Sequence, residues 1–203
     1  MNSYTDLINE LILKGALHTS SIIEAFKHID RANFVSTPLF GDIYGDYPLQ
    51  IGHGQTISQP STVAMMLEML EPKEGEKILD IGSGSGWTTA LLAFIVKKNG
   101  FVTGVERVEN LVELGQENLA KYSFSNAKII QANDTLGIPG EKFDRILVSA
   151  AADELPYKLL QQLKTNGKLV IPIQDFIYEI TKLNDEKIKT VKHYGFAFVP
   201  LIY

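Results

Sequence analysis

The spacing of apolar side chains changes twice along this chain. Up to residue 70, segments with the period of a helix flank an irregular stretch. From 77 to 173 short apolar runs alternate with helical stretches, and from 177 onward strand-like runs follow one another directly. The first helix is predicted over 3–14, with its apolar residues on one face and Gly15 at its end.

The next segment combines helix signals with a long irregular stretch. Ser21 and Glu24 have the spacing of a capping box, which predicts a second helix over 21–29. Residues 31–58 are rich in Gly, Pro, Asp and Tyr. Loops of this length inside compact proteins tend to be functional, so we expect a lid or a substrate loop there. A third helix is predicted over 60–70, with a proline in its first turn.

Alternating strands and helices are typical of an α/β fold. We predict a doubly wound, mainly parallel sheet with helices on both faces, antiparallel C-terminal strands at one edge and an N-terminal helical and loop extension. The expected strands are 77–81, 101–106, 127–132, 143–150, 168–173, 177–183, 188–194 and 196–203, and the expected helices of this region are 86–97, 109–121 and 155–163.

Length and composition fit one globular domain. The chain has 203 residues, of which 45% are hydrophobic and 21% charged, and no internal repeat appears. We expect a single domain over 1–203, with N-terminal helices and a lid-like loop in 1–58, a ligand-binding core in 59–176 and C-terminal strands in 177–203.

Charge and residue types exclude several classes of function. A net charge of −5 argues against a nucleic-acid partner, because such binding relies on basic side chains. The chain has no cysteine and its four histidines are scattered, so we expect no metal site. The N-terminus does not resemble a signal peptide, and the longest apolar run, 90–96, is too short for a membrane span. We therefore expect a soluble, cytoplasmic protein that has no membrane partner.

A glycine-rich turn follows the strand predicted over 77–81. Residues 80–87 read D-I-G-S-G-S-G-W, and glycines there permit a tight turn and a close approach of a ligand to the backbone. A dinucleotide site would need its third glycine at Trp87. The spacing is G-x-G-x-G instead, and an acid two residues before the first glycine favours a cation over a pyrophosphate.

S-adenosyl-L-methionine carries a sulfonium and an ammonium, so its charge fits such a turn. The pattern resembles the first motif of the class I methyltransferases. The candidate cofactor-binding residues of the turn are Asp80, Gly82, Ser83, Gly84 and Gly86.

Acidic residues also end the next two strands. Glu106 lies where an acid normally accepts hydrogen bonds from ribose hydroxyls, a device that dinucleotide enzymes and methyltransferases share. Asp134 and Thr135 follow the third strand, where methyltransferases commonly contact the adenine. Acids at the ends of three successive strands predict a cofactor site at one edge of the sheet.

Four segments together resemble the protein-L-isoaspartate O-methyltransferases. The likeness runs from about residue 20 to the last residues, and G-Q-T-I-S-Q-P is its most diagnostic part. The segments are 44–60 (Y-G-D-Y-P-L-Q-I-G-H-G-Q-T-I-S-Q-P), 143–152 (F-D-R-I, then A-A-A), 167–172 (G-K-L-V-I-P) and 198–201 (F-V-P-L).

The resemblance implies roles for particular residues. Ser58 would be the catalytic residue, and Thr56 and Ile57 would line the cofactor side of its pocket together with it. The substrate, an isoaspartyl peptide or protein, would contact Ser58, Gln59, Val199, Pro200 and Leu201. The cofactor would be S-adenosyl-L-methionine, with S-adenosyl-L-homocysteine as product and no metal.

The implied chemistry needs orientation more than a strong base. A carboxylate is already ionised at neutral pH, so the enzyme must desolvate it and hold one oxygen near the methyl carbon. A serine hydroxyl can orient a carboxylate by one hydrogen bond, and the helix N-terminus that follows Ser58 would favour an anion. Without the family resemblance, the sequence favours a plain helix cap at Ser58.

The sequence departs from the family pattern at three places. Gly-Asp-Gly is replaced by Asn133-Asp134-Thr135, Ser61 stands where some relatives have histidine or tyrosine, and Gln174 replaces a frequent glycine. These changes bear on affinity and substrate range more than on the type of reaction.

Three hypotheses remain at this stage. The first is repair of isoaspartyl residues by methylation of their free α-carboxylate. The second is a methyltransferase for RNA or a small metabolite, which the acidic balance and the segment around Ser58 disfavour. The third is a non-catalytic cofactor-binding protein, which intact Asp80, Glu106 and Ser58 disfavour.

Overall fold

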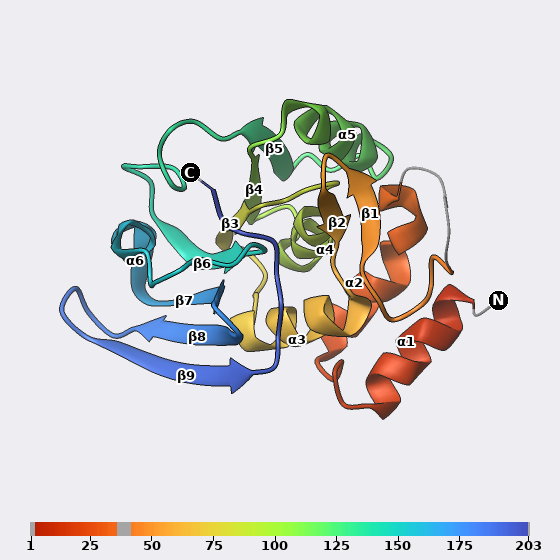
Figure 1. The fold of residues 1–203 in the computed structure, drawn as a ribbon, viewed down its shortest axis with the longest axis horizontal. Helices are drawn as coiled ribbons and strands as arrows, with labels where there is room; N and C mark the ends of the chain where they lie inside the picture. The colour runs from red at the N-terminus through yellow and green to blue at the C-terminus, as the bar shows by residue number, and fades with distance from the viewer. Residues whose placement is uncertain (1–2, 36–41, 203) are drawn as a thin grey trace.

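A single mixed sheet forms the centre of the molecule. The computed structural model describes residues 3–35 and 42–202. Seven strands form the sheet in the order β5-β4-β3-β6-β7-β8-β9 (Figure 1). The strands are β3 (Lys77–Ile81), β4 (Phe101–Glu106), β5 (Ala127–Gln131), β6 (Phe143–Val148), β7 (Leu163–Ile173), β8 (Phe176–Lys182) and β9 (Ile188–Tyr194), and a separate hairpin consists of β1 (Leu49–Gly52) and β2 (Gln55–Ile57).

Strand directions confirm the predicted fold class. β5, β4, β3, β6 and β7 pair in parallel, whereas β8 and β9 are antiparallel additions at one edge. The chain order reverses between β3 and β6, which are neighbours in the sheet. In open sheets of this kind a ligand binds beyond the carboxyl ends of the strands at such a reversal.

Helices cover both faces of the sheet, but unequally. One cluster of buried side chains lies between the sheet and α1 to α5, and a second lies between the other face and α6. Because successive strand residues point to opposite faces, Ile78 belongs to the first cluster and Leu79 to the second. The helices are α1 (Tyr4–Leu13), α2 (Ser20–His28), the 3-10 helix η1 (Arg31–Phe34), α3 (Pro60–Leu70), α4 (Trp87–Val96), α5 (Glu109–Ala120) and α6 (Tyr157–Gln162).

Two helix starts differ from the prediction. The capping box belongs to α1, where the Ser3 and Asp6 side chains each bond the other's backbone N–H. α2 begins at Ser20 without a side-chain cap, and Glu24 pairs with Lys27 instead. The spacing of Ser21 and Glu24 therefore matched the motif, but the N-cap of α2 is Thr19, two residues before Ser21.

The predicted loop 31–58 contains regular structure. It starts with η1 and ends with the β1–β2 hairpin, and its residues 36–41 lie outside the described part of the chain. The hairpin stands beyond the carboxyl ends of β3 and β4 (Figure 1). It therefore lies close to the end of the sheet where a ligand is expected.

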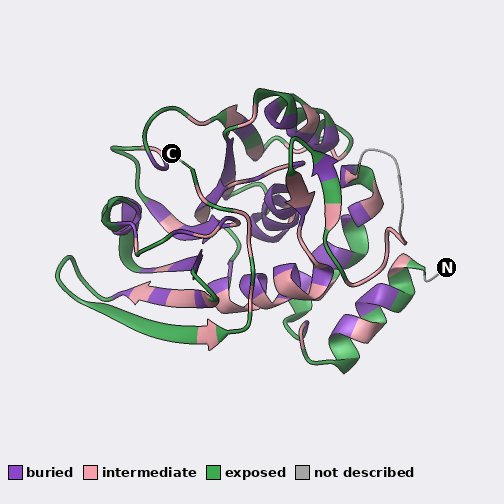
Figure 2. Cartoon of the chain, in the orientation of Figure 1, coloured by how far each residue is buried: buried purple, intermediate pink, exposed green. Residues whose placement is uncertain are grey.

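The prediction of a strand over 196–203 is wrong for its described residues, 196–202. Gly195, at a φ of +104°, turns the chain away from the exposed strand β9, and the segment crosses back over the parallel strands (Figures 1 and 2). The Ala151 N–H donates to Val199 O at 2.8 Å, and the Leu201 N–H donates to Ala151 O at 2.7 Å. This contact brings the C-terminal segment to the end of β6.

Candidate active site

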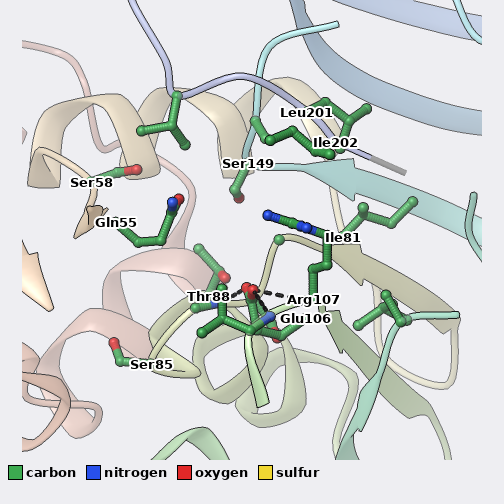
Figure 3. A pocket seen from close by; sticks show the side chains of 18 of the residues that line it. Gln55, Ser58, Ile81, Ser85, Thr88, Glu106, Arg107, Ser149, Leu201 and Ile202 are labelled. Atoms are coloured by element: carbon green, nitrogen blue, oxygen red, sulfur yellow. Dashed lines mark hydrogen bonds between the residues drawn. The ribbon is translucent and has the colours of Figure 1, made fainter. Parts of the chain in front are cut away.

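A cavity opens at the carboxyl ends of β3, β4 and β6, where the strand order reverses. It encloses about 1030 Å³ of empty space, a volume that includes its open mouth. Figure 3 shows side chains from separate elements turned toward one another around it. Most of its lining comes from residues 55–58, 81–85, 105–108, 132–133, 135–137, 149–150 and 199–202.

The glycine-rich turn forms one wall, and its glycines differ in role. Gly82 and Gly84 line the cavity with φ of +73° and +53°, which glycine adopts without strain. Gly86 does not line it. A Cβ on Gly86 would lie 3.0 Å from Ile129 Cδ1 and 3.2 Å from Gly115 O, so this glycine allows α4 to pack closely.

Ser83 stands between these glycines and also lines the cavity. Its side chain is buried, and its Oγ has no hydrogen-bond partner within the described residues. Buried polar atoms are normally paired. An unpaired hydroxyl in a cavity wall therefore points to a ligand that completes the hydrogen bond.

Asp80 does not line the cavity, contrary to the expectation from its position. Its side chain is fully buried behind the turn, where Oδ2 accepts hydrogen bonds from Thr88 Oγ1 at 2.7 Å and Thr89 Oγ1 at 2.6 Å. Oδ1 has no partner. Burial, partly offset by the two hydroxyls, raises the pKa of Asp80 from 3.8 to about 6. Asp80 thus joins the turn to α4, and its role in cofactor binding stays a prediction.

Glu106 is placed as predicted, at the end of β4 and in the cavity wall. The carboxylate is held by three backbone N–H groups: Oε2 accepts from Gly84 at 2.9 Å, and Oε1 accepts from Arg107 at 2.8 Å and Val108 at 2.9 Å (Figure 3). An ionised carboxylate has about four acceptor positions, so it can still accept from a ligand. Fixed acceptors at this place match the hydroxyls of a ribose.

The segment after β5 contributes neighbours of the predicted acid. Asn133 and Thr135 line the cavity, whereas Asp134 is exposed and does not. The Thr135 N–H donates to Asn133 Oδ1 at 3.0 Å, which closes a small turn around Asp134. Thr135 thus lies in the cavity wall and Asp134 directly beside it, and the expected cofactor contacts of both stay predictions.

A second cavity adjoins the first on the side of α3. Gln59 lines only this one, and Pro200 and Leu201, expected on the substrate side, line only the first. The four residues that line both cavities are Thr56, Ser58, Ser149 and Val199. The two cavities therefore meet at a wall that includes the predicted catalytic serine.

Ser58 is not a helix cap. The N-cap of α3 is Gln59, which makes no side-chain cap bond, and the Ser61 N–H donates to Asp46 Oδ1 at 2.8 Å. Asp46 thus occupies the helix N-terminus that was expected to favour a substrate anion. No described residue hydrogen-bonds the Ser58 hydroxyl, so it is available to a ligand.

Arg31 holds the turn that presents Ser58. It is fully buried, and Nη2 donates to Tyr47 O at 2.9 Å and to Ser58 O at 3.2 Å. Nη1 donates to Ile43 O at 2.6 Å and to Gly45 O at 3.3 Å. One side chain therefore ties the 43–47 loop to the backbone of the predicted catalytic residue.

Several residues of the wall were not predicted from the sequence. Ser149 follows β6, and its side chain points into the space between Ser58 and Arg107 in Figure 3. Arg107 and Gln55 also line the first cavity. No group of three or more potential metal ligands occurs among residues 3–35 and 42–202, and none of their helices is long and apolar enough to cross a membrane.

Comparison with known proteins identifies the family. A family model for protein-L-isoaspartate(D-aspartate) O-methyltransferase (PCMT) matches residues 2–203. The chain belongs to this family. A protein-L-isoaspartate O-methyltransferase of Methanopyrus kandleri is 41% identical to it over 202 residues, covering 97% of this chain and 89% of that protein. One of Pyrococcus horikoshii is 39% identical over 201 residues, covering 96% and 90%.

A solved member of the PCMT family has the same fold. The crystal structure of a Plasmodium falciparum protein-L-isoaspartate O-methyltransferase, in complex with S-adenosyl-L-homocysteine, superposes with a TM-score of 0.89 at 32% identity. The match covers 100% of this chain and 99% of that one. As a PCMT family member, the chain is an S-adenosylmethionine-dependent methyltransferase.

The first cavity fits the cofactor of the PCMT family. Glu106 offers fixed acceptors for ribose hydroxyls, the Ser83 hydroxyl has no partner among the described residues, and Gly82 and Gly84 line the cavity. The cofactor's methyl group is electrophilic because it is bonded to a positively charged sulfur.

Proposed function

We propose that this enzyme transfers a methyl group from S-adenosyl-L-methionine to the free α-carboxylate of L-isoaspartyl residues in damaged proteins. The observation that carries the proposal is the meeting of two cavities at Ser58. One cavity has the ribose acceptors and the glycine turn of a cofactor site. The other would receive the segment of the substrate protein that contains the isoaspartyl residue. Membership of the PCMT family supports the choice of acceptor.

The residues around Ser58 fit a reaction that needs no base. The carboxylate is already ionised at neutral pH, so its oxygen can attack the methyl carbon directly. Ser58 would donate one hydrogen bond that orients the carboxylate. Arg31 and Asp46 hold the backbone on either side of it, which keeps the hydroxyl in a fixed position.

The second cavity is suited to removing water from the carboxylate of a bound peptide. Apolar residues of the C-terminal segment, Phe196, Phe198 and Val199, form part of its wall. Removing water from a carboxylate there strengthens its interaction with the few donors around it. An isoaspartyl linkage would present its α-carboxylate on a short branch, closer to the peptide backbone than the side-chain carboxylate of aspartate.

The later reaction of the methyl ester indicates the role of the enzyme. The methyl ester would collapse to a succinimide, which hydrolyses partly to a normal aspartyl residue. We therefore propose protein repair as the role of the enzyme, with flexible protein segments as its substrates.

A pair of peptides tests the proposal. The enzyme should methylate a peptide that contains one L-isoaspartyl residue, and its aspartyl twin of identical sequence should remain unlabelled. Transfer of labelled methyl groups to base-labile esters measures both. Equal labelling of the two peptides, or labelling of neither, would reject the proposal in favour of another acceptor.

A further inference from the structure

The wall shared by the two cavities contains an unassigned hydroxyl. Of the four residues that line both cavities, Thr56, Ser58 and Ser149 have hydroxyl groups, and Val199 does not. A methyl group transferred from a cofactor in one cavity to a substrate in the other must pass beside these four residues. Each hydroxyl there therefore lies close to the path of transfer.

Ser149 has a rigid backbone and an available side chain. Its N–H donates to Ile81 O at 2.9 Å, which fixes the end of β6 against β3 in the middle of the sheet. Its side chain is half-buried, and no described residue hydrogen-bonds its Oγ. In Figure 3 the side chains of Ser58 and Ser149 come from opposite sides of the junction, one from the turn before α3 and the other from the end of β6.

The second cavity offers a carboxylate neutral donors only. Its described lining residues include no Lys, Arg or His, and their polar side chains are those of Thr56, Ser58, Gln59, Ser61, Thr62 and Ser149. A carboxylate has two oxygens with about four acceptor positions, and removing it from water without partners is costly. One hydroxyl can satisfy one oxygen, so the other oxygen needs a second donor.

We propose that Ser149 is a second substrate-binding residue, whose Oγ–H donates to the isoaspartyl α-carboxylate while Ser58 donates to the same group. With both hydroxyls in place, the carboxylate cannot rotate, and one lone pair faces the methyl carbon. The oxygen–carbon bond forms as the carbon–sulfur bond breaks, and the electron pair of the broken bond stays on sulfur. No proton moves, so both serines remain protonated throughout.

This inference rests on the proposed function, because it assigns a contact to that acceptor. The variants needed are Ser149→Ala, Ser149→Thr, Ser58→Ala and the double variant Ser58→Ala with Ser149→Ala. Ser125→Ala is the control, since Ser125 is exposed in the turn before β5 and lines neither cavity. For each we would measure KM and kcat for the isoaspartyl peptide, the Kd of S-adenosyl-L-homocysteine and the Tm.

The expected result separates a peptide contact from a cofactor contact. Ser149→Ala should lower kcat/KM for the peptide by about tenfold or more, as loss of a hydrogen bond to a charged group does. The Kd of S-adenosyl-L-homocysteine should change less than about twofold, and Ser149→Thr should recover most of the activity. The losses in the double variant should not be additive, because both hydroxyls act on one group.

Other outcomes would overturn the inference. An unchanged kcat/KM in Ser149→Ala, or a raised Kd for S-adenosyl-L-homocysteine with an unchanged peptide KM, would make Ser149 a bystander or a cofactor contact. Strict additivity with Ser58→Ala would mean that the two serines act on different groups. If the wild-type enzyme labels isoaspartyl and aspartyl peptides equally, the proposed function itself fails, and the assigned contact fails with it.

Discussion

At the residue scale, the carboxylate of Glu106 has two tasks. It accepts hydrogen bonds from the N–H groups of Gly84, Arg107 and Val108, which fix the glycine turn against the end of β4. It also presents its remaining acceptor positions to the cavity. Because one group does both, its replacement should weaken cofactor binding and the local structure together.

Replacing Glu106 tests the ribose contact. Glu106→Ala should weaken binding of S-adenosyl-L-homocysteine by about 1.5–3 kcal/mol, the usual value for hydrogen bonds to a charged group. Glu106→Gln keeps the shape of the side chain and should lose less. Glu109→Gln is the control, since Glu109 is exposed in the first turn of α5. Titration calorimetry that finds the same affinity in Glu106→Ala and the wild type would contradict the assignment.

Asp80 introduces a pH dependence of stability. Its pKa of about 6 in the folded protein lies above the ordinary 3.8, so between these values the folded state binds the proton more strongly than the unfolded state. The free energy of unfolding should therefore fall as pH rises from about 4 to about 6, and this contribution is constant above that range. Ionised Asp80 is thus a stability cost at neutral pH.

The substitution Asp80→Asn removes this cost. Its amide oxygen can still accept from Thr88 or Thr89, so relative to wild type the variant should gain stability as pH rises from 4 to 7. The gain should reach at most about 3 kcal/mol, since each pKa unit corresponds to about 1.4 kcal/mol. Urea unfolding of both proteins at pH 4, 5.5 and 7 measures it. A stability difference that does not vary with pH would contradict the account.

At the scale of elements, the turn before α3 depends on a residue from η1. Arg31 is the donor to Tyr47 O and Ser58 O, and it also holds Ile43 O and Gly45 O. Asp46 holds the N-terminus of α3 from the same loop. The position of Ser58 is therefore set by contacts far from it in the sequence.

The substitution Arg31→Met tests this arrangement. It removes four hydrogen bonds from a buried position and should destabilise the fold by about 2–4 kcal/mol, because partners left unpaired are costly. In protein that remains folded, kcat for the isoaspartyl peptide should fall while the affinity for S-adenosyl-L-homocysteine changes little. Lys27→Met is the control, since Lys27 is exposed and pairs with Glu24 on the surface of α2. Unaltered kcat in folded Arg31→Met would exclude a positioning role.

The sequence predicted the strands of the sheet well because their apolar runs are bounded by turns. It failed over 196–202, where aromatic and apolar residues have strand character but form, within the described residues, only an isolated bridge between Pro200 and Ala151. Phe196 and Phe198 instead pack against the core beside α3 and the sheet. The local sequence pattern predicts which residues are buried, but the tertiary structure determines which element they pack against.

The site was predicted in position more than in detail. Strand ends located the correct edge of the sheet, and Glu106 faces the cavity as expected. The direction of a side chain at the end of a strand or in a loop depends on the local backbone, so the sequence did not reveal that Asp80 is buried behind the turn and that Asp134 is exposed. Ser149 was missed because S-A-A-A after β6 has no charge, although the rule that both strands at the reversal flank the ligand would have indicated it.

At the scale of the whole molecule, both cavities need the C-terminal segment. Residues 199–202 line the first, and 195–199 line the second. The hydrogen bonds of Ala151 with Val199 and Leu201 hold this segment across the sheet. The division into segments 1–58, 59–176 and 177–203 and the cytoplasmic location stay predictions.

Removal of the C-terminal segment tests its part in both cavities. A chain that ends at Gly195 keeps every strand of the sheet and should fold with reduced stability. At about 100 times its Kd, S-adenosyl-L-homocysteine should stabilise the full chain by about 2.7 kcal/mol and the shortened chain by much less. Chemical unfolding with and without the ligand measures this. Equal stabilisation of both chains would show that the segment is not part of the cofactor site.

A crystal structure of the enzyme with S-adenosyl-L-homocysteine tests the central claim most directly. The account predicts ribose hydroxyls at Glu106, backbone contacts at Gly82 and Gly84, and the sulfur atom at the wall shared by the two cavities, facing Ser58. A nucleoside bound away from Glu106, or a sulfur atom directed away from Ser58, would contradict it.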